Sequence, residues 1–343
     1  MMLQLLEFRE SVKKFYQRYD TYLLPIIKFI FALIAFQTIN KEIGYDARLK
    51  ALPIILGLSL LSAFTPSAVM VLIAALISVL HVYFISPILS VIIVVILMIL
   101  YLLFARYTPR HGYVLLAVPV LFLLKIPYLI PILLGLISTP IAMIPTSCGV
   151  VVYFLFQIIK SAITMQVNIS LEDILQLYTH VIDSLTGNRQ MIMTVVIFSL
   201  IIMVTYFIRR MSFDYAFEIS ILAGAFIGIL GFLISYLILD KSDQILSMIL
   251  GTIVSTGLVY IIHFFRLTLD YTGVEYAQFE DDVYYYYVKA VPKATVTAPQ
   301  VNVRHYSVKK SGRIDINEYD NQETYDDYDY NDDDYEDEDD NDS

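Results

Sequence analysis

One lysine lies inside an apolar stretch and is the first residue that could do chemistry. Lys125 stands between Leu124 and the Ile126-Pro127 pair, in a part of the chain that five prolines interrupt. A charged side chain at membrane depth costs about 3 kcal/mol on insertion scales, so it usually faces a cavity, a carboxylate or the headgroups. Either Lys125 is a site for a substrate anion or a proton at the end of a broken helix, or it marks a turn near the interface and reaches the headgroups.

A small polar run interrupts the next apolar stretch. Pro145-Thr146-Ser147-Cys148-Gly149 combines a helix breaker, two hydroxyls and a glycine. Unwound segments of this kind offer carbonyl and hydroxyl oxygens to permeant species in transporters. Ser147 therefore joins Lys125 as a candidate substrate or proton site, and a tight turn between two spans explains the run equally well.

Two acidic residues begin a later apolar stretch. Asp214 and Glu218 are four residues apart, so on a helix they share a face that could bind a cation or form an ion pair with Lys28 in the first apolar stretch, or with Arg209 or Arg210. A charge cluster at an interfacial helix end, with Lys28 reaching the headgroups, is the simpler alternative.

Three glycines give one smooth face to the stretch that follows. Gly224, Gly228 and Gly231 lie at the spacing that lets helix backbones approach closely. We expect this face to pack against another helix, either within the chain or in a homo-oligomer.

The sequence lacks the motifs of common enzyme classes. It has no Gly-x-x-x-x-Gly-Lys-[Ser/Thr] loop, no His-Glu-x-x-His and no Gly-x-Ser-x-Gly, so nucleotide hydrolysis, metalloprotease and serine hydrolase chemistry lack their parts. The single cysteine excludes an intramolecular disulfide and a cysteine-based metal site. We therefore expect no catalytic residues, no metal or cofactor, and no nucleic-acid partner.

The composition places these residues in a membrane protein. Of 343 residues, 58% are hydrophobic and only 16% charged, which is too apolar for a soluble domain. Long uncharged runs recur between residues 22 and 265, the predicted transmembrane domain. The sequence predicts an all-α polytopic transmembrane helical bundle in the lipid bilayer, with about eight spans and roughly seven to ten allowed by the run lengths.

Prolines divide the longest runs. No charged side chain occurs between Ala51 and Ala105, which leaves room for two long passes or three short ones with breaks at Pro66 and Pro87. The proline-rich stretch 112–159 has room for one to three crossings, and short, kinked or re-entrant segments are an alternative to full-length helices.

Two amphipathic segments accompany the spans. Residues 1–21 mix apolar side chains with lysine and arginine and lack a signal cleavage site, so we expect a helix on the cytoplasmic surface. Within 160–190, apolar residues recur at helical spacing after Ser170, a candidate N-cap, which predicts an external amphipathic helix.

Basic residues at span ends set the predicted orientation. Arg209, Arg210 and Arg266 lie at ends that alternating crossings place on one side, and Arg106 joins them. Because cytoplasmic loops are enriched in lysine and arginine, this side and the C-terminus are predicted to be cytoplasmic. The basic loop 41–50 lies inside if the run after it crosses twice, and outside if it crosses three times.

The chain after the last span divides into two parts. In the juxtamembrane segment 266–313, Tyr284, Tyr285, Tyr286 and Tyr287 predict a short strand or a docking segment for a partner. Of the 33 acidic residues, 16 lie in 315–343, which contains no lysine or arginine, so the rest of the chain carries a net charge of +6. Residues 314–343 cannot bury enough apolar surface to fold and are predicted to be a disordered acidic tail.

One element of this region has a counterpart elsewhere. The run Glu-Asp-Asp-x-Tyr-Tyr-Tyr-Tyr-Val-Lys-Ala-Val-Pro-Lys at 280–293, after a final apolar span, resembles one in uncharacterised multi-pass membrane proteins of clostridia-like Firmicutes. The resemblance covers only the last span and the segment after it, and it implies a bacterial plasma membrane. That group has no activity to carry over.

Two functional hypotheses remain. The first is a permease-like transport component whose broken segments around Lys125 and Pro145 line a path. Without a nucleotide site it would be ion-driven, passive, or energised by a separate cytoplasmic ATPase. The second is a non-catalytic scaffold that recruits cytoplasmic or envelope-assembly proteins through the tyrosine-rich segment and the acidic tail. Proline-broken spans with an embedded lysine favour transport.

Overall fold

A computed structural model of the chain describes residues 2–166, 174–266, 275–280 and 283–291. These residues form helices, one two-stranded sheet and connecting turns, which confirms the predicted all-α class. The predicted acidic tail 314–343, most of the juxtamembrane segment 266–313 and the candidate N-cap Ser170 lie outside the described residues.

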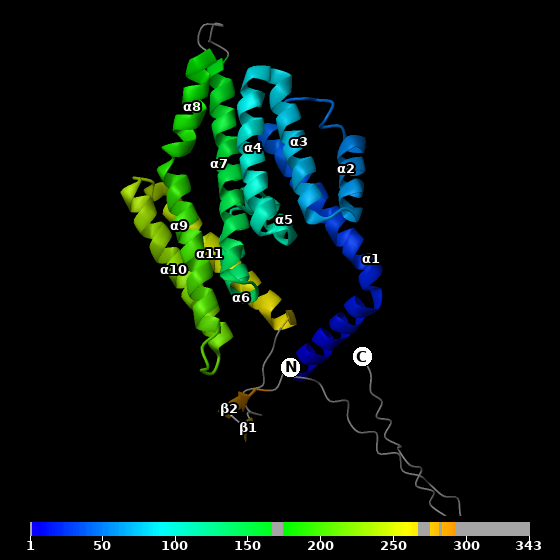
Figure 1. Ribbon diagram of the computed structural model, residues 1–343, viewed down its shortest axis with the longest axis vertical. Coiled ribbons are helices and arrows are strands. Elements are labelled where there is room, and N and C mark those ends of the chain that lie inside the picture. The colour runs from blue at the N-terminus through cyan, green and yellow to red at the C-terminus, as the bar shows by residue number, and fades with distance from the viewer. Residues whose placement is uncertain (1, 167–173, 267–274, 281–282, 292–343) are drawn as a thin grey trace, which may run out of the picture. The chain divides into compact units, whose positions relative to one another are not determined.

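The helices of the described residues follow one another with short connections (Figure 1). They are α1 (Met2–Ile43), α2 (Leu52–Phe64), α3 (Ser67–Ile85), α4 (Pro87–Tyr107), α5 (Gly112–Leu123), α6 (Leu129–Ile137), α7 (Met143–Gln166), α8 (Ile174–Thr186), α9 (Arg189–Arg209), α10 (Ala216–Ile238) and α11 (Ile245–Arg266). Short 3-10 turns, η1 (Pro109–His111), η2 (Pro140–Ala142) and η4 (Ser242–Gln244), precede α5, α7 and α11.

Seven helical segments among the described residues are long and apolar enough to cross a membrane. Large apolar side chains stay exposed along their outer faces, a surface that suits lipid and not water. The chain is therefore a multi-pass membrane protein. The seven segments are Gln4–Ile43, Ser67–Ile85, Pro87–Tyr107, Pro140–Thr164, Thr179–Arg209, Ala216–Ile238 and Ser242–Arg266.

The predicted surface segment 1–21 is the first half of α1. The backbone leaves helical geometry at Tyr19 (φ −114°, ψ 17°), and Pro25 follows inside the helix. The helix changes direction there, close to the predicted boundary (Figure 1). The first segment is thus continuous with the first span.

Prolines set the boundaries in the long uncharged run. Pro66 precedes α3, and Pro87 is the first residue of α4, where its missing N–H costs no helical hydrogen bond. The Ser86 hydroxyl caps α4 by accepting a hydrogen bond from the Leu89 N–H at 3.2 Å. The run forms three helices with breaks at the two predicted prolines, and α2, with 13 residues, is the shortest.

Buried apolar side chains form two clusters. The first cluster contains side chains of α1, α2, α3, α4 and α5 and of one face of α7. The second contains side chains of α6, α9, α10 and α11 and of a different face of α7. Figure 1 shows α7 between the two groups of helices. This central helix therefore couples the two halves of the bundle.

The proline-rich stretch before α7 forms a hairpin of two short helices. With 12 and nine residues, α5 and α6 are about 18 and 14 Å long, well short of a hydrocarbon core of about 30 Å. Gly149 of α7 lies against Leu115 and Val118 of α5, and Gly135 of α6 lies against Thr205 of α9. Helix α5 thus packs along α7, and α6 packs along α9. Because α7 and α9 run in opposite directions, the hairpin enters and leaves at one end of the bundle.

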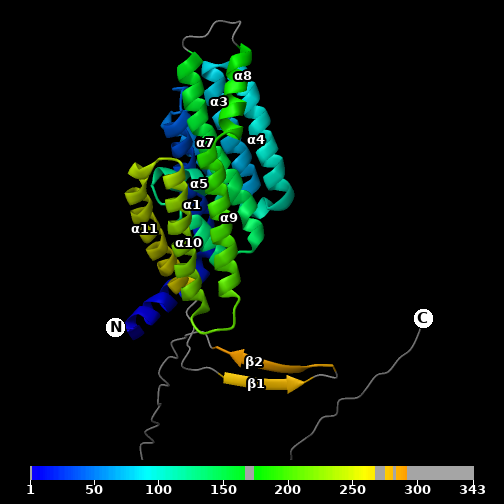
Figure 2. The same ribbon diagram turned by 90° about the vertical axis from the view of Figure 1, so that its left-hand side faces the viewer.

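The predicted external helix 160–190 is divided differently. Residues up to Gln166 complete α7, so the prediction was wrong there, and the separate helix is α8. At its end the Gly187 N–H donates to the Asp183 carbonyl at 2.8 Å, and the Asn188 carboxamide caps α9 by accepting from the Met191 N–H at 3.0 Å. These two residues let α8 stand end to end with α9 (Figures 1 and 2).

After the last span the chain forms an antiparallel hairpin of β1 (Glu275–Glu280) and β2 (Tyr285–Ala290). Glu275 lies opposite Ala290, and Phe279 lies opposite Tyr286, on which its ring stacks at 5.0 Å. The predicted short strand is therefore one half of a hairpin.

Candidate functional site

The turn between α5 and α6 places Lys125 at depth in the bundle. Lys125 has a left-handed backbone conformation (φ 59°), and the Ile126 N–H closes α5 on the Leu121 carbonyl at 3.0 Å. A Cβ at Gly251 would lie 2.5 Å from the Lys125 carbonyl oxygen, so only glycine permits this contact with α11. Gly251 is six residues after the start of α11, a distance of about 9 Å along that helix.

A second contact gives the same depth. The ring of Phe122, one turn before Lys125, stacks on Tyr153 in the middle of α7 at 4.1 Å. Lys125 therefore marks a turn, as one interpretation of the sequence had it, and the turn lies beside the middle of α7 and about 9 Å inside the start of α11.

The Lys125 side chain lines a cavity of about 620 Å³, called here the Lys125 cavity. Its walls come from the α5–α6 turn, the middle of α7, the start of α9 and the α10–α11 connection. Three tyrosines line the cavity, Tyr128, Tyr153 and Tyr236. The rest of its polar lining consists of Lys125, Gln157, Asn188, Gln190, Asp243, Gln244 and Ser247. Since Asn188 and Asp243 precede α9 and α11, the cavity lies toward the end opposite Arg209 and Arg266.

The charges on this lining are unpaired. Lys125 and Asp243 are both exposed, and neither forms an ion pair within the part of the chain that the structure describes. At the rim, the Lys241 ammonium is engaged by the Gln190 carbonyl oxygen at 2.5 Å. A cation and an anion on one cavity wall can bind a solute that carries the opposite charges.

A cluster of buried aromatic rings lies next to the cavity. Tyr128 packs edge-on against Phe232 at 5.1 Å and against Phe198 at 6.4 Å, and these two phenylalanines meet at 5.7 Å. All three side chains are buried. Tyr128, which lines the Lys125 cavity, therefore belongs to a buried aromatic cluster.

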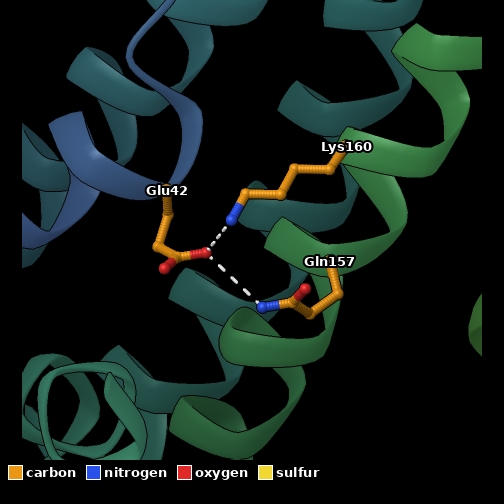
Figure 3. Close-up of polar contacts among 3 residues, drawn as sticks. All are labelled: Glu42, Gln157 and Lys160. Atoms are coloured by element: carbon orange, nitrogen blue, oxygen red, sulfur yellow. Dashed lines mark hydrogen bonds and ion pairs between the residues drawn. The ribbon is translucent and has the colours of Figure 1, made fainter. Parts of the chain in front are cut away.

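An ion pair between a buried carboxylate and a partly exposed lysine joins α1 to α7 beside this cavity. Figure 3 shows Glu42, near the end of α1, between Lys160 and Gln157 of α7. The Gln157 amide donates to the Glu42 carboxylate at 3.4 Å, and Lys160 pairs with the same oxygen. Because Gln157 also lines the cavity, it connects the cavity wall to the Glu42–Lys160 pair.

Ser147 does not join Lys125. The run Pro145–Gly149 lies in the first turns of α7 and is helical, so the predicted unwound segment or turn is wrong. The break falls just before it, between Ser138 and Ala142. Ser147 is half-buried and does not line the Lys125 cavity.

The acidic pair has partners other than those predicted. Asp214 pairs with Lys289 of β2 at 2.6 Å, and the Glu218 carboxylate faces His263 at 3.5 Å. Asp214 also lies outside α10, because this helix starts at Ala216 and contains Glu218 in its first turn. Within the described residues, Lys28 forms no ion pair with either of them, so this possible pairing is not observed.

The glycine face packs inside the chain. Cβ atoms at Gly224, Gly228 and Gly231 would meet α9, the first at 2.3 Å from the Thr205 hydroxyl oxygen. The other two would lie 3.1 Å from Ile201 and Ile197, respectively. Of the two alternatives, packing within the chain is the one observed.

The four tyrosines lie at the start of β2. Tyr284 precedes the strand, and Tyr285 to Tyr287 are its first residues. Tyr285 and Tyr287 are 67% and 79% exposed, whereas Tyr286 is partly covered by Phe279. The hairpin thus presents aromatic side chains on its surface.

No family model, curated protein or solved structure matches this chain. Within the described residues, no three side chains of His, Cys, Asp or Glu gather as metal ligands would. The chemistry of the Lys125 cavity is therefore the basis on which function is inferred.

Sequence reasoning missed three residues of this region. In the sequence, Asp243 lies in a short polar connection between two apolar runs, Gln157 is a lone amide in an apolar run, and Glu42 belongs to the charged loop 41–50. Gln157 was the detectable one, because an isolated amide in a span needs a polar partner or a cavity. The other two gain their meaning only from the packing of distant helices.

Proposed function

We propose that the protein is a membrane transport component that takes a small polar solute into the Lys125 cavity. The observation that carries this proposal is an unpaired lysine at the tip of a hairpin of two short apolar helices, on the wall of a cavity with a polar lining. Charged groups and helix breaks at this depth are tolerated where they line a water-filled space, and discontinuous helices form binding sites in transporters.

The lining suggests the class of solute. The Lys125 ammonium suits a carboxylate or another anionic group, and Asp243 suits an ammonium group on the same molecule. The amides of Gln157, Asn188 and Gln190 offer neutral hydrogen bonds between them. An anionic or zwitterionic solute therefore fits better than an apolar one.

The orientation is part of the proposal. With Arg209, Arg210 and Arg266 on the cytoplasmic side of a bacterial plasma membrane, the C-terminus is cytoplasmic and the Lys125 cavity faces outward. The basic loop at 41–50 is then external, since three helices separate it from Arg106. Energy would come from an ion gradient, from the solute gradient, or from a separate ATPase.

The test is solute binding and uptake by purified protein. Glutamate, alanine, arginine and glucose serve as anionic, zwitterionic, cationic and neutral probes in thermal-shift assays and then in proteoliposomes. Glutamate or alanine should raise the melting temperature and enter the vesicles, and Lys125→Ala should abolish both effects. Lys28→Ala, a half-buried lysine on α1 outside the described cavities, is the matched control. Equal behaviour of the two variants would exclude the role of Lys125.

A second candidate rests on the exposed tyrosines of the β-hairpin. They favour a scaffold that recruits cytoplasmic or envelope proteins, because clustered exposed aromatic residues are typical of binding surfaces. Co-purification of the full chain and of a version ending at Tyr271 separates the two functions. Recovery of an ATPase supports transport, whereas partners lost with the truncation support the scaffold.

A further inference from the structure

We propose that the protein binds the phosphate of an anionic phospholipid headgroup in a cleft at the end opposite the Lys125 cavity. This arginine cleft has a volume of about 150 Å³ and lies between α6, α9, α10 and α11. Its lining comprises Leu136, Ile137, Arg209, Phe217, Ile262, His263 and Arg266. It shares no residue with the Lys125 cavity, so the inference is independent of the transport proposal.

Positive charge gathers here without a counter-ion. Arg210 and Arg266 both lie close enough to Arg209 to repel its charge. None of the three arginines forms an ion pair with a described carboxylate. Of the two acidic residues nearby, Asp214 pairs with Lys289 at 2.6 Å, and the Glu218 carboxylate lies 3.5 Å from His263, which itself lines the cleft.

Arg209 is held in place by the protein itself. Its guanidinium donates to the Leu136 carbonyl and to the Ser138 carbonyl, the latter at 2.5 Å, at the end of α6. It also packs over the Tyr206 ring at 5.1 Å. Its Nε is buried and has no hydrogen-bond acceptor. A fixed guanidinium with a free donor is a prepared site for an anion.

Arg266 supplies the second, adaptable contact. It is exposed at the last residue of α11 and lines the cleft. Two arginines can hold a phosphate by charge-assisted hydrogen bonds, which are stronger than neutral ones. The anion would also reduce the repulsion between the arginines.

The apolar part of the lining favours a lipid over free phosphate. Leu136, Ile137, Phe217 and Ile262 line the same cleft as Arg209 and Arg266. Ile262 keeps 37% of its surface exposed, on a helix whose end lies at the interface. A phospholipid places phosphate beside arginine and its acyl chain beside these side chains, whereas free phosphate uses only the first contact.

Native mass spectrometry tests the site directly. The full-length protein is purified in mixed micelles of phosphatidylglycerol and phosphatidylcholine, and the bound lipids are counted. Wild type should retain phosphatidylglycerol in preference, and Arg266→Gln should lower its affinity about tenfold or more, the loss expected for a hydrogen bond between charged groups of about 1.5–3 kcal/mol. Arg266→Lys, which keeps the charge but loses the guanidinium fork, should fall between them.

Arg210→Gln is the matched control. Arg210 neighbours Arg209, is exposed, donates to the Tyr206 hydroxyl at 2.7 Å and does not line the cleft. It removes the same charge, so retention near the wild-type level is expected. Equal losses in Arg210→Gln and Arg266→Gln would reduce the effect to general surface charge and overturn the site. Displacement of phosphatidylglycerol by millimolar inorganic phosphate would overturn the lipid as its ligand.

Discussion

Substituting Gly224 by alanine should force α9 and α10 apart. The added Cβ would lie 2.3 Å from the Thr205 hydroxyl oxygen and 3.6 Å from the Ile201 methyl group, well inside contact distance for the first. Thr205 has little room to move, because the α6 backbone at Gly135 packs closely on its other side, where an added Cβ would lie 2.6 Å from the Thr205 Cβ. Overpacking of this kind costs typically about 1–3 kcal/mol. For a domain of this size that corresponds to a fall of roughly 2–10 °C in melting temperature.

The assay is thermal melting of the purified protein in detergent, followed by the loss of the monodisperse peak. Gly257→Ala is the matched control, because a Cβ there would meet nothing within 4 Å, and it should be neutral or stabilising since alanine is the better helix former. Adding Thr205→Ala to Gly224→Ala should restore part of the loss. Equal melting of the Gly224→Ala and Gly257→Ala proteins would refute the close α9–α10 packing.

Three further predictions concern the end of the bundle that lies away from Arg209 and Arg266. Lys160→Met should lower the melting temperature more than Glu42→Gln, because the first leaves a 6% exposed carboxylate unpaired and the second a 38% exposed lysine; equal effects would contradict this burial. Burial and, second, the Glu42 charge raise the pKa of the Tyr45 phenol. Glu42→Gln should therefore lower that pKa, as measured by ¹⁹F NMR titration of 3-fluorotyrosine at position 45. An unchanged pKa would show that the Glu42 charge does not act on Tyr45. Asn188→Ala removes the cap of α9 and should cost about 1 kcal/mol in denaturant titrations; no change would show that the cap is dispensable.

The helical class and several boundaries could be predicted because they depend on local chemistry. Uncharged runs long enough to span a bilayer and prolines that start helices are visible in the chain itself, as at Pro66 and Pro87. The α7–α8 division was not visible, because Lys160 looks like the start of a polar stretch when its partner is unknown. The structure pairs it with Glu42 of α1, which lets α7 continue to Gln166.

The candidate site could be predicted only in part. Lys125 stood out because a lysine in an apolar, proline-broken stretch must face a cavity, a carboxylate or the headgroups. The sequence could not show that its turn lies level with the middle of α7, since that depth depends on the contacts of Phe122 with Tyr153 and of Lys125 with Gly251. Ser147 failed for the opposite reason. A proline within the first turn of a helix looks like a break in sequence but is compatible with helical structure.

The central claim is that Lys125 faces a water-filled cavity open at the end opposite the arginines. Cysteine labelling tests it, because the chain has a single, buried cysteine, Cys148, that can be replaced by alanine. A membrane-impermeant maleimide is applied to either side of oriented proteoliposomes carrying Lys125→Cys, Asp243→Cys, Arg210→Cys or the fully buried Ile132→Cys.

Lys125→Cys and Asp243→Cys should react from one side, Arg210→Cys from the other, and Ile132→Cys from neither. Lys125→Cys that stays unlabelled, or that reacts from the Arg210 side, would contradict the account.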